Sequence, residues 1–205
     1  MLKVKICGIT NLDDAQAAVH AGCDAIGFLF YKKSPRYISP EQAKDIIDKL
    51  PKNVIKIGVF VNAKEEIIKR IARICKFRML QFHGSESPEF CARFKGYRII
   101  KTFRVKGKLD VKDMARYHPF AFLFDTYIAN KSGGTGKKFN WKLIRHIDGL
   151  KRPVFLAGGL TEKNVRTAVK ITEPAWVDVC SGVEEKPGKK DHKKVKEFIK
   201  AAKVV

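Results

Sequence analysis

The run Ala25-Ile26-Gly27-Phe28-Leu29-Phe30 opens the stretch of sequence that decides the fold. Ser39-Pro40 then opens a helical segment, and a second apolar run, Val54–Val61, leads into a second helical segment, Lys64–Cys75. A continuous apolar run is typical of a strand buried on both faces, and proline is suited to the first turn of a helix. Strands and helices in alternation indicate parallel strands joined by right-handed crossovers. This stretch therefore predicts an α/β protein with a parallel sheet.

The same alternation extends to both ends of the chain. Further strands are predicted at Val4–Ile6, Met79–Phe82, Arg98–Thr102, Ala121–Phe124, Val154–Leu156 and Trp176–Val179. Further helices are predicted over Ser87–Phe94, Val111–Tyr117, Trp141–Ile147 and Lys193–Ala202. Two more are predicted to begin at a capping residue, one after Asn11 and one from Thr161 through Val169. Eight strand–helix units of about 25 residues fit a single-domain (β/α)8 TIM barrel over residues 1–205, at the small end of that fold's range. A doubly wound open sheet is the alternative, but it usually has fewer strands, and no Gly-x-Gly-x-x-Gly follows the first strand here.

The chain is strongly basic, with 42 Lys and Arg against 21 Asp and Glu and a net charge of +21. Such a charge favours nucleic-acid binding as one hypothesis. However, the basic residues are spread along the whole sequence and are not interleaved with aromatic residues in one segment. Such a distribution is typical of lysines that coat the outer faces of many helices. A positive field also attracts a small anionic substrate. We therefore predict no nucleic-acid partner.

The cysteines and histidines favour neither a metal site nor a disulfide framework. The five cysteines are odd in number and contain no Cys-x-x-Cys pair, and the five histidines are scattered. Because structural zinc sites need clustered ligands, we expect no metal and no cofactor. No apolar run reaches the length of about 18 residues that spans a bilayer, and residues 1–8 lack the apolar segment of a signal peptide. These features predict a cytoplasmic protein without a membrane partner.

In a TIM barrel the chemistry lies where the strands end at their carboxyl termini. In this sequence reactive residues occupy those positions or follow them closely. They are Cys7, Arg36, Gln81 and His83, Asp125, Gly158 and Gly159, and Asp178 with Ser181 and Gly182. Polar residues placed at random would have no reason to fall at so many strand ends, so we predict that these groups line one site.

Two glycine turns indicate the class of ligand. Gly158-Gly159 and Ser181-Gly182 follow the last two predicted strands, where this fold usually binds phosphate through backbone N–H groups and a helix N-terminus. Each pair taken alone could simply allow a tight turn, but together they favour a phosphorylated substrate. The segment Ser132–Gly136 is no P-loop, because Lys131 stands where the first glycine is required and Lys138 stands where Ser or Thr should follow. We interpret this segment as a lid.

A series of motifs runs in a fixed order along nearly the whole chain. It comprises Lys5-Ile6-Cys7-Gly8-Ile9-Thr10, Gly27-Phe28-Leu29-Phe30 with Ser34-Pro35-Arg36, Gln81-Phe82-His83-Gly84, Leu123-Phe124-Asp125-Thr126, Gly133-Gly134-Thr135-Gly136, Ala157-Gly158-Gly159-Leu160 and Asp178-Val179-Cys180-Ser181-Gly182-Val183-Glu184. The series resembles the phosphoribosylanthranilate isomerases of tryptophan biosynthesis. The first hexapeptide is the most specific motif, whereas the glycine motifs recur in other phosphate-binding barrels. Cys180 departs from the family, which usually has Ser at this position.

The resemblance implies an Amadori rearrangement of N-(5'-phosphoribosyl)anthranilate to 1-(2-carboxyphenylamino)-1-deoxyribulose 5-phosphate. By this resemblance Asp125 is the general acid that opens the furanose ring, and Cys7 is the general base that removes the C2' proton. These roles require a carboxyl group whose pKa is raised by burial and a thiol whose pKa is lowered by nearby positive charge. Outside the resemblance, Cys7 could be an inert core thiol, and Asp125 could be a loop cap or the partner of a lysine.

The remaining candidates would bind the substrate. The guanidinium group of Arg36 suits a bidentate grip on the anthranilate carboxylate, although Arg36 could equally be a surface charge. Asp178 would orient the ribose hydroxyl groups, and Gln81 and His83 would bind substrate or only support the site. Another phosphate-binding barrel of sugar-phosphate or indole metabolism is the alternative enzyme. The expected partner is a small anionic phosphosugar, and the protein is expected to be a monomer or a homodimer.

Overall fold

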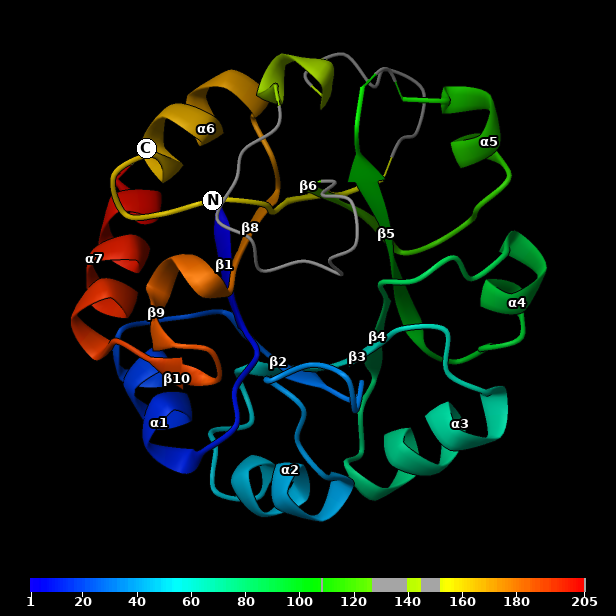
Figure 1. Ribbon diagram of the computed structural model, residues 1–205, viewed down its shortest axis with the longest axis horizontal. Helices are drawn as coiled ribbons and strands as arrows, with labels where there is room; N and C mark the ends of the chain where they lie inside the picture. The colour runs from blue at the N-terminus through cyan, green and yellow to red at the C-terminus, as the bar shows by residue number, and fades with distance from the viewer. Residues whose placement is uncertain (108, 127–139, 145–151, 205) are drawn as a thin grey trace.

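The computed structural model describes residues 1–107, 109–126, 140–144 and 152–204. Eight parallel strands form a closed barrel in which each strand pairs with the next and the last pairs with the first (Figure 1). They are β1 (Lys3–Cys7), β2 (Ala25–Leu29), β3 (Ile55–Phe60), β4 (Met79–Phe82), β5 (Arg98–Val105), β6 (Ala121–Thr126), β7 (Val154–Leu156) and β8 (Trp176–Val179). The predicted (β/α)8 fold class is thereby confirmed.

Helices form a ring around the outside of this barrel (Figure 1). They are α1 (Leu12–His20), α2 (Pro40–Ile47), α3 (Glu65–Ile74), α4 (Pro88–Ala92), α5 (Val111–Ala115), α6 (Val165–Thr172) and α7 (His192–Lys203), with short 3-10 helices η1 (Trp141–Ile144) and η2 (Ser181–Val183). Asn11 caps α1 by accepting a hydrogen bond from the Asp14 N–H, and Ser39 begins α2 with a capping box. No helix within the described ranges combines the length and apolarity that crossing a membrane requires.

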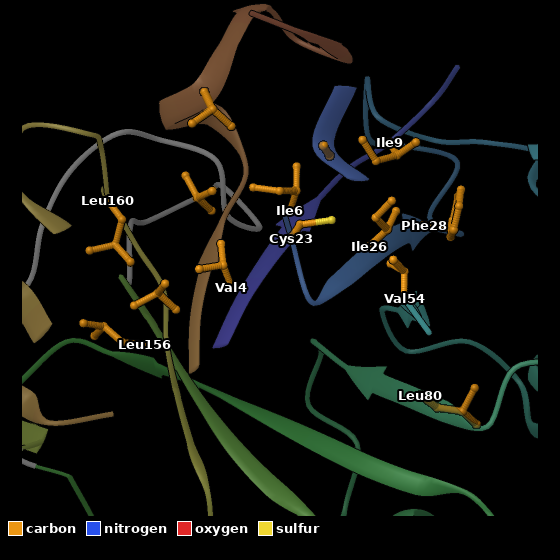
Figure 2. Packing of buried hydrophobic residues seen from close by; sticks show 14 of the residues in the cluster. Val4, Ile6, Ile9, Cys23, Ile26, Phe28, Val54, Leu80, Leu156 and Leu160 are labelled. Carbon is orange, nitrogen blue, oxygen red and sulfur yellow. The ribbon is translucent and has the colours of Figure 1, made fainter. Parts of the chain in front are cut away.

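Alternate residues of the strands point to opposite faces, and this period of two separates the core into two layers. Val4, Ile6, Ile26 and Leu156 belong to the larger cluster, which fills the space between the barrel and its helices (Figure 2). A smaller cluster fills the barrel interior and includes Ala25, Ile57, Leu123, Phe155 and Trp176. Lys3, Lys5 and Cys7 alternate with Val4 and Ile6 along β1, so this strand sends its polar positions inward.

Several local predictions differ from the structure. Thr161 does not cap α6; the helix begins at Val165 after Asn164, because the Asn164 side chain instead binds the backbone N–H of Thr161. The hairpin of β9 (Glu184–Lys186) and β10 (Lys189–Lys190) was not predicted, since its strands are too short and too highly charged to give an apolar pattern. Only Trp141–Ile144 of the helix predicted over Trp141–Ile147 is described, as a 3-10 helix. The lid predicted at Ser132–Gly136 lies outside the described residues.

Candidate active site

A pocket of about 550 Å³ opens at the carboxyl ends of the strands. All the predicted site residues except Gly182 border this pocket, and the pocket also takes in residues that sequence patterns did not indicate. The predicted residues are Cys7, Arg36, Gln81, His83, Asp125, Gly158, Gly159, Asp178 and Ser181, and among the additional ones are Leu29, Tyr31, Val59, Val61 and Cys180. The structure therefore brings together side chains that lie more than 170 residues apart in the chain.

Cys7 lies at the end of β1, above a buried ion pair. The Lys5 ammonium, with its side chain fully buried, donates to both carboxylate oxygens of Asp178 at 2.9 Å. The parallel register of β1 and β8 sets Lys5 beside Asp178, and the register of β1 and β2 sets Cys7 beside Gly27. The thiol of Cys7 and the carboxylate of Asp178 thus border the pocket on neighbouring strands, and the buried ammonium group of Lys5 pairs with that carboxylate.

The expected lowering of the Cys7 pKa is wrong. Burial raises the pKa of this thiol above its ordinary value, whereas the charge of Lys5 lowers it and the carboxylate of Asp178 raises it. The predicted positive charge is present, but the thiol loses more water than one ammonium group, itself paired with an anion, can compensate.

Asp125, at the end of β6, belongs to a row of polar groups. One carboxylate oxygen accepts a hydrogen bond from the Thr126 N–H at 2.7 Å, and the other lies 3.2 Å from Nε2 of His83. Nδ1 of His83 lies 3.0 Å from the amide nitrogen of Gln81. Because an amide nitrogen can only donate, Nδ1 accepts and the ring proton of a neutral His83 resides on Nε2, facing Asp125. Gln81 therefore orients His83 so that Nε2 faces Asp125 at 3.2 Å, although the geometry of this pair falls short of a hydrogen bond.

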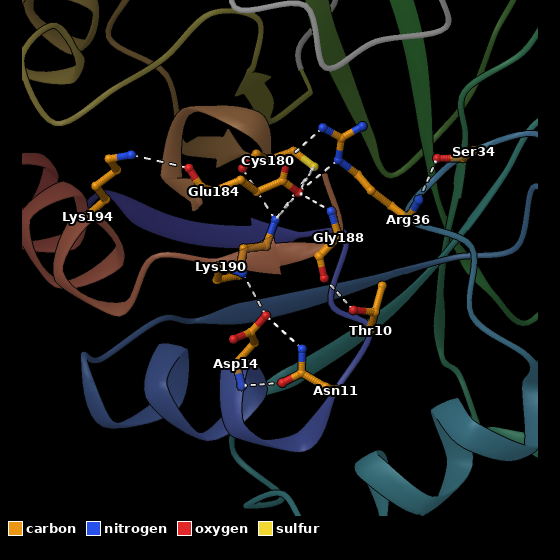
Figure 3. A network of polar contacts seen from close by, with 10 residues as sticks. All are labelled: Thr10, Asn11, Asp14, Ser34, Arg36, Cys180, Glu184, Gly188, Lys190 and Lys194. Carbon is orange, nitrogen blue, oxygen red and sulfur yellow. Dashed lines mark hydrogen bonds and ion pairs between the residues drawn. The ribbon is translucent and has the colours of Figure 1, made fainter. Parts of the chain in front are cut away.

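Arg36 is held by a residue that the sequence analysis missed. Its Nε and Nη2 atoms donate to the two carboxylate oxygens of Glu184 at 2.8 and 2.6 Å (Figure 3). Lys190 approaches the same carboxylate at 2.9 Å. Burial acts to raise the pKa of Glu184, but the hydrogen bonds of Arg36 and the charge of Lys190 bring it below its ordinary value. One edge of the Arg36 guanidinium group is therefore occupied, so the predicted grip on a substrate carboxylate would have to use the edge formed by Nη1 and Nη2.

The β9–β10 hairpin positions this network. The Lys190 N–H donates to Asp14 of α1 at 2.7 Å, and the Thr10 hydroxyl donates to the carbonyl of Gly188 (Figure 3). Cys180 lies 3.8 Å from both the Lys190 ammonium and Glu184, and burial raises its pKa to about 12. Cys180 is accordingly a neutral thiol directed at the ion network.

The glycine turn after β7 is shaped by a close approach of two loops. Gly158 and Gly159 have φ values of +86° and +64°, in the left-handed region that favours glycine. A Cβ atom on Gly158 would lie 2.3 Å from the Thr126 hydroxyl and 2.9 Å from a carboxylate oxygen of Asp125. Asn164 donates to the carbonyl of Gly159 at 2.9 Å and fixes the turn. Gly182 does not border the pocket, because it packs against the carbonyl of Leu160, where a Cβ would lie only 1.9 Å from the oxygen.

Comparison with known proteins agrees with this arrangement. A sequence model of the family described as N-(5'phosphoribosyl)anthranilate (PRA) isomerase matches residues 4–201. The N-(5'-phosphoribosyl)anthranilate isomerase of Trichlorobacter lovleyi is 47% identical over 203 residues, which cover 99% of this chain and 98% of that protein. The chain belongs to this isomerase family. The family predicted from the motifs is thereby confirmed.

Solved structures of PRA isomerases share the fold over the entire chain. The crystal structure of the Thermotoga maritima protein is 45% identical and gives a TM-score of 0.94, with 100% of both chains covered. A PRA isomerase in complex with reduced 1-(o-carboxyphenylamino)-1-deoxyribulose 5-phosphate is 43% identical and gives a TM-score of 0.90, also with 100% of both chains covered.

Sequence patterns did not predict that three charged residues of this PRA isomerase family member lie at or beside the site: Lys5, Glu184 and Lys190. A signal for Lys5 was present, because the alternation of Lys3-Val4-Lys5-Ile6-Cys7 places Lys5 on the same face as Cys7. Glu184 was quoted only as the end of a motif, and its partner Arg36 is 148 residues away. Nothing local in the sequence connects the two.

Proposed function

We propose that this chain converts N-(5'-phosphoribosyl)anthranilate to 1-(2-carboxyphenylamino)-1-deoxyribulose 5-phosphate, a step of tryptophan biosynthesis. The observation that carries the proposal is that Cys7 and Asp125, at the ends of β1 and β6, border the same pocket as the glycine turn of β7. A reaction that moves protons within a phosphosugar needs an acid, a base and an anion site around one cavity.

The two proton carriers act in sequence. Asp125, in its protonated form, gives its proton to the furanose ring oxygen, so that the C1'–O bond breaks and an imine forms between C1' and the anthranilate nitrogen. Cys7, as its thiolate, then removes the C2' proton. Ring opening leaves the C1'–N group as a cationic iminium, because the nitrogen lone pair forms the new double bond. The electron pair of the C2'–H bond neutralises this iminium group and gives an enolamine, which tautomerises to the ketone. His83 and Thr126 hold the Asp125 carboxyl group in place for the first transfer.

The rest of the pocket suits the other parts of the substrate. Leu29, Val59 and Val61 offer an apolar wall for the anthranilate ring. The Nη1–Nη2 edge of Arg36 would bind the anthranilate carboxylate, while Glu184 keeps the guanidinium group in a fixed plane. The carboxylate of Asp178 has lone pairs that Lys5 does not use, and one of them would accept a hydrogen bond from a ribose hydroxyl group.

The phosphate would bind between the last two strand ends. Backbone N–H groups near Gly158, Gly159 and Ser181 are the proposed donors, and Gly182 contributes indirectly by letting the two loops approach each other. We expect Gly159→Val to weaken inorganic phosphate as a competitive inhibitor together with the substrate, because a side chain would block the close approach of the backbone. Equal inhibition of the variant and the wild type would place the phosphate elsewhere.

We also propose that the protein works in the cytoplasm as a monomer or a homodimer. All five cysteines are free, which is typical of a reducing compartment. The mass in solution, measured by light scattering, decides between one and two chains.

Loss of substrate fluorescence, followed with and without EDTA, tests the proposed activity. We expect turnover that EDTA does not change and that Cys7→Ala lowers by at least about 10²-fold. An absence of turnover by the wild type would contradict the proposal. The nucleic-acid alternative makes a different prediction, since DNA binding by the +21 chain would then fall steeply as salt rises.

A further inference from the structure

We propose that Lys5 is a positioning residue that stabilises the thiolate of Cys7, with Asp178 holding the ammonium group in place and moderating its effect. This proposal rests on the proposed function, in which Cys7 is the base. Lys5 would not touch the substrate; it would act through the sulfur atom.

The geometry places the ammonium group next to the thiol inside the barrel. Lys5 and Cys7 are two residues apart on β1, so both side chains point into the barrel. Gly27 of β2 faces both: a Cβ atom there would lie 2.7 Å from the Cys7 sulfur and 3.2 Å from the Lys5 nitrogen. The missing side chain of Gly27 thus leaves the space that the sulfur and the ammonium group share.

The charge of Lys5 is fixed in this position. Its side chain is 0% exposed, and both oxygens of Asp178 bind its nitrogen at 2.9 Å. Burial acts against the ammonium form, but Asp178 and Cys7 raise the pKa of Lys5 well above its ordinary value. Lys5 therefore stays charged across the pH range in which a thiol ionises.

The other charged or titratable groups around Cys7 do not replace this contribution. Arg36, from the segment between β2 and α2, and Lys190, from β10, both bind Glu184. Cys180, which follows β8, is a neutral thiol with a raised pKa. Among these groups Lys5 lowers the pKa of Cys7 most and Asp178 raises it most. The two members of one ion pair should therefore shift the ionisation of Cys7 in opposite directions.

Two variants separate this role from a structural one. Lys5→Met removes the positive charge and leaves the Asp178 anion beside the thiol. The double variant Lys5→Met/Asp178→Asn removes both charges and replaces a buried ion pair by neutral groups of similar size, which proteins often tolerate. We expect the pH midpoint of Cys7 ionisation to rise in the order wild type, double variant, Lys5→Met.

The measurement is the alkylation of Cys7 by iodoacetamide in the substrate-free enzyme, as a function of pH. Peptide mass spectrometry follows Cys7 and, as an internal reference in the same digest, Cys91, which lies on α4 away from the pocket. We expect Lys5→Met to raise the Cys7 midpoint by at least about one pH unit, a tenfold change in the ratio of thiolate to thiol at fixed pH. Equal midpoints in the wild type and the double variant would overturn the proposal. This comparison does not require Lys5→Met, so it tests the proposal even if that single variant does not fold.

The pH profile of kcat/KM then tests the role of Lys5 separately from the proposed role of Cys7 as the base. If Cys7 is the base, the acidic limb of kcat/KM moves with the alkylation midpoint. If the alkylation midpoint shifts and the acidic limb does not, Lys5 controls the thiol but Cys7 is not the base. A fall in kcat/KM by the same factor at every pH, with no shift of the midpoint, would assign Lys5 a purely structural role.

Discussion

The two ends of the barrel handle positive charge in different ways. At the mouth, carboxylates meet the cations: Lys5 pairs with Asp178, and Arg36 pairs with Glu184. At the opposite end, a cavity of about 440 Å³ is lined, in the described part of the chain, by apolar and aromatic residues and two cations. There Lys3 lies 5.2 Å from the ring centre of Trp176, and Arg98 lies 5.1 Å from that of Phe120.

The contrast separates the chemistry of the molecule from its stability. A cation over an aromatic ring contributes about 0.5–1 kcal/mol at a partly exposed site and imposes little direction. A carboxylate that binds a nitrogen through both oxygens fixes the position of the charge. β1 and β8 contribute to both ends, because Lys3 and Trp176 lie at the base while Cys7 and Asp178 lie at the mouth. Substitutions at the mouth should therefore change rates, and substitutions at the base should change stability.

The largest effect is expected from the proposed acid and base. Cys7→Ala and Asp125→Asn should each lower kcat by about 10²- to 10⁴-fold, the range for a lost general acid or base. Both residues lie at strand ends, so the thermal midpoint should change little. Steady-state kinetics and circular dichroism melting test this expectation. Near-wild-type kcat in either folded variant would show that its assigned role is wrong.

At the base, Trp176→Ala should lower the free energy of unfolding by about 3 kcal/mol, as is typical for truncation of a buried aromatic side chain. Trp176 is 5% exposed and stacks on Phe155 with ring centres 4.7 Å apart. Denaturant unfolding measures the loss, and Trp176→Phe is the matched control that keeps a ring at this position. The folded fraction of Trp176→Ala should keep its kcat. A large loss of kcat without destabilisation would erase the distinction between the two ends.

A smaller effect, on binding, is expected at Arg36. Arg36→Met should raise KM by about tenfold or more and change kcat less, because a contact with the carboxylate is present in both the ground and transition states. An aniline analogue without the carboxylate should respond little to the same substitution. Equal losses for both substrates would mean that Arg36 mainly fixes Glu184 and the hairpin.

The smallest effect concerns the overall charge. If the field of +21 speeds encounter with the anionic substrate, kcat/KM should fall a few-fold from low to physiological salt while kcat stays nearly constant. Lys3→Met, at the far end of the barrel, should leave this salt dependence unchanged. A flat kcat/KM would show that the basic surface does not serve this substrate.

The barrel was predictable because its strands are apolar runs and its helices are amphipathic, and both patterns are local. The strand-end rule also placed Cys7 and Asp125 at the pocket from sequence alone. What sequence did not give depends on pairs distant in the chain: Arg36 with Glu184, and Lys5 with Asp178, 148 and 173 residues apart. The net pKa of Cys7 was mispredicted for the same reason, since it is set by a balance between burial and two opposite charges.

The Lys5–Asp178 pair also constrains how the chain can be made. The first strand leaves the ribosome 173 residues before the partner of its lysine exists. Until that partner arrives, an ammonium group without a counterion resists leaving water, so β1 has a reason to remain hydrated. Joining the first strand to the last therefore closes the barrel and completes the ion pair next to Cys7 in one event. A nascent or truncated chain that lacks β8 should contain no partly working site, only an exposed thiol and a lysine in water.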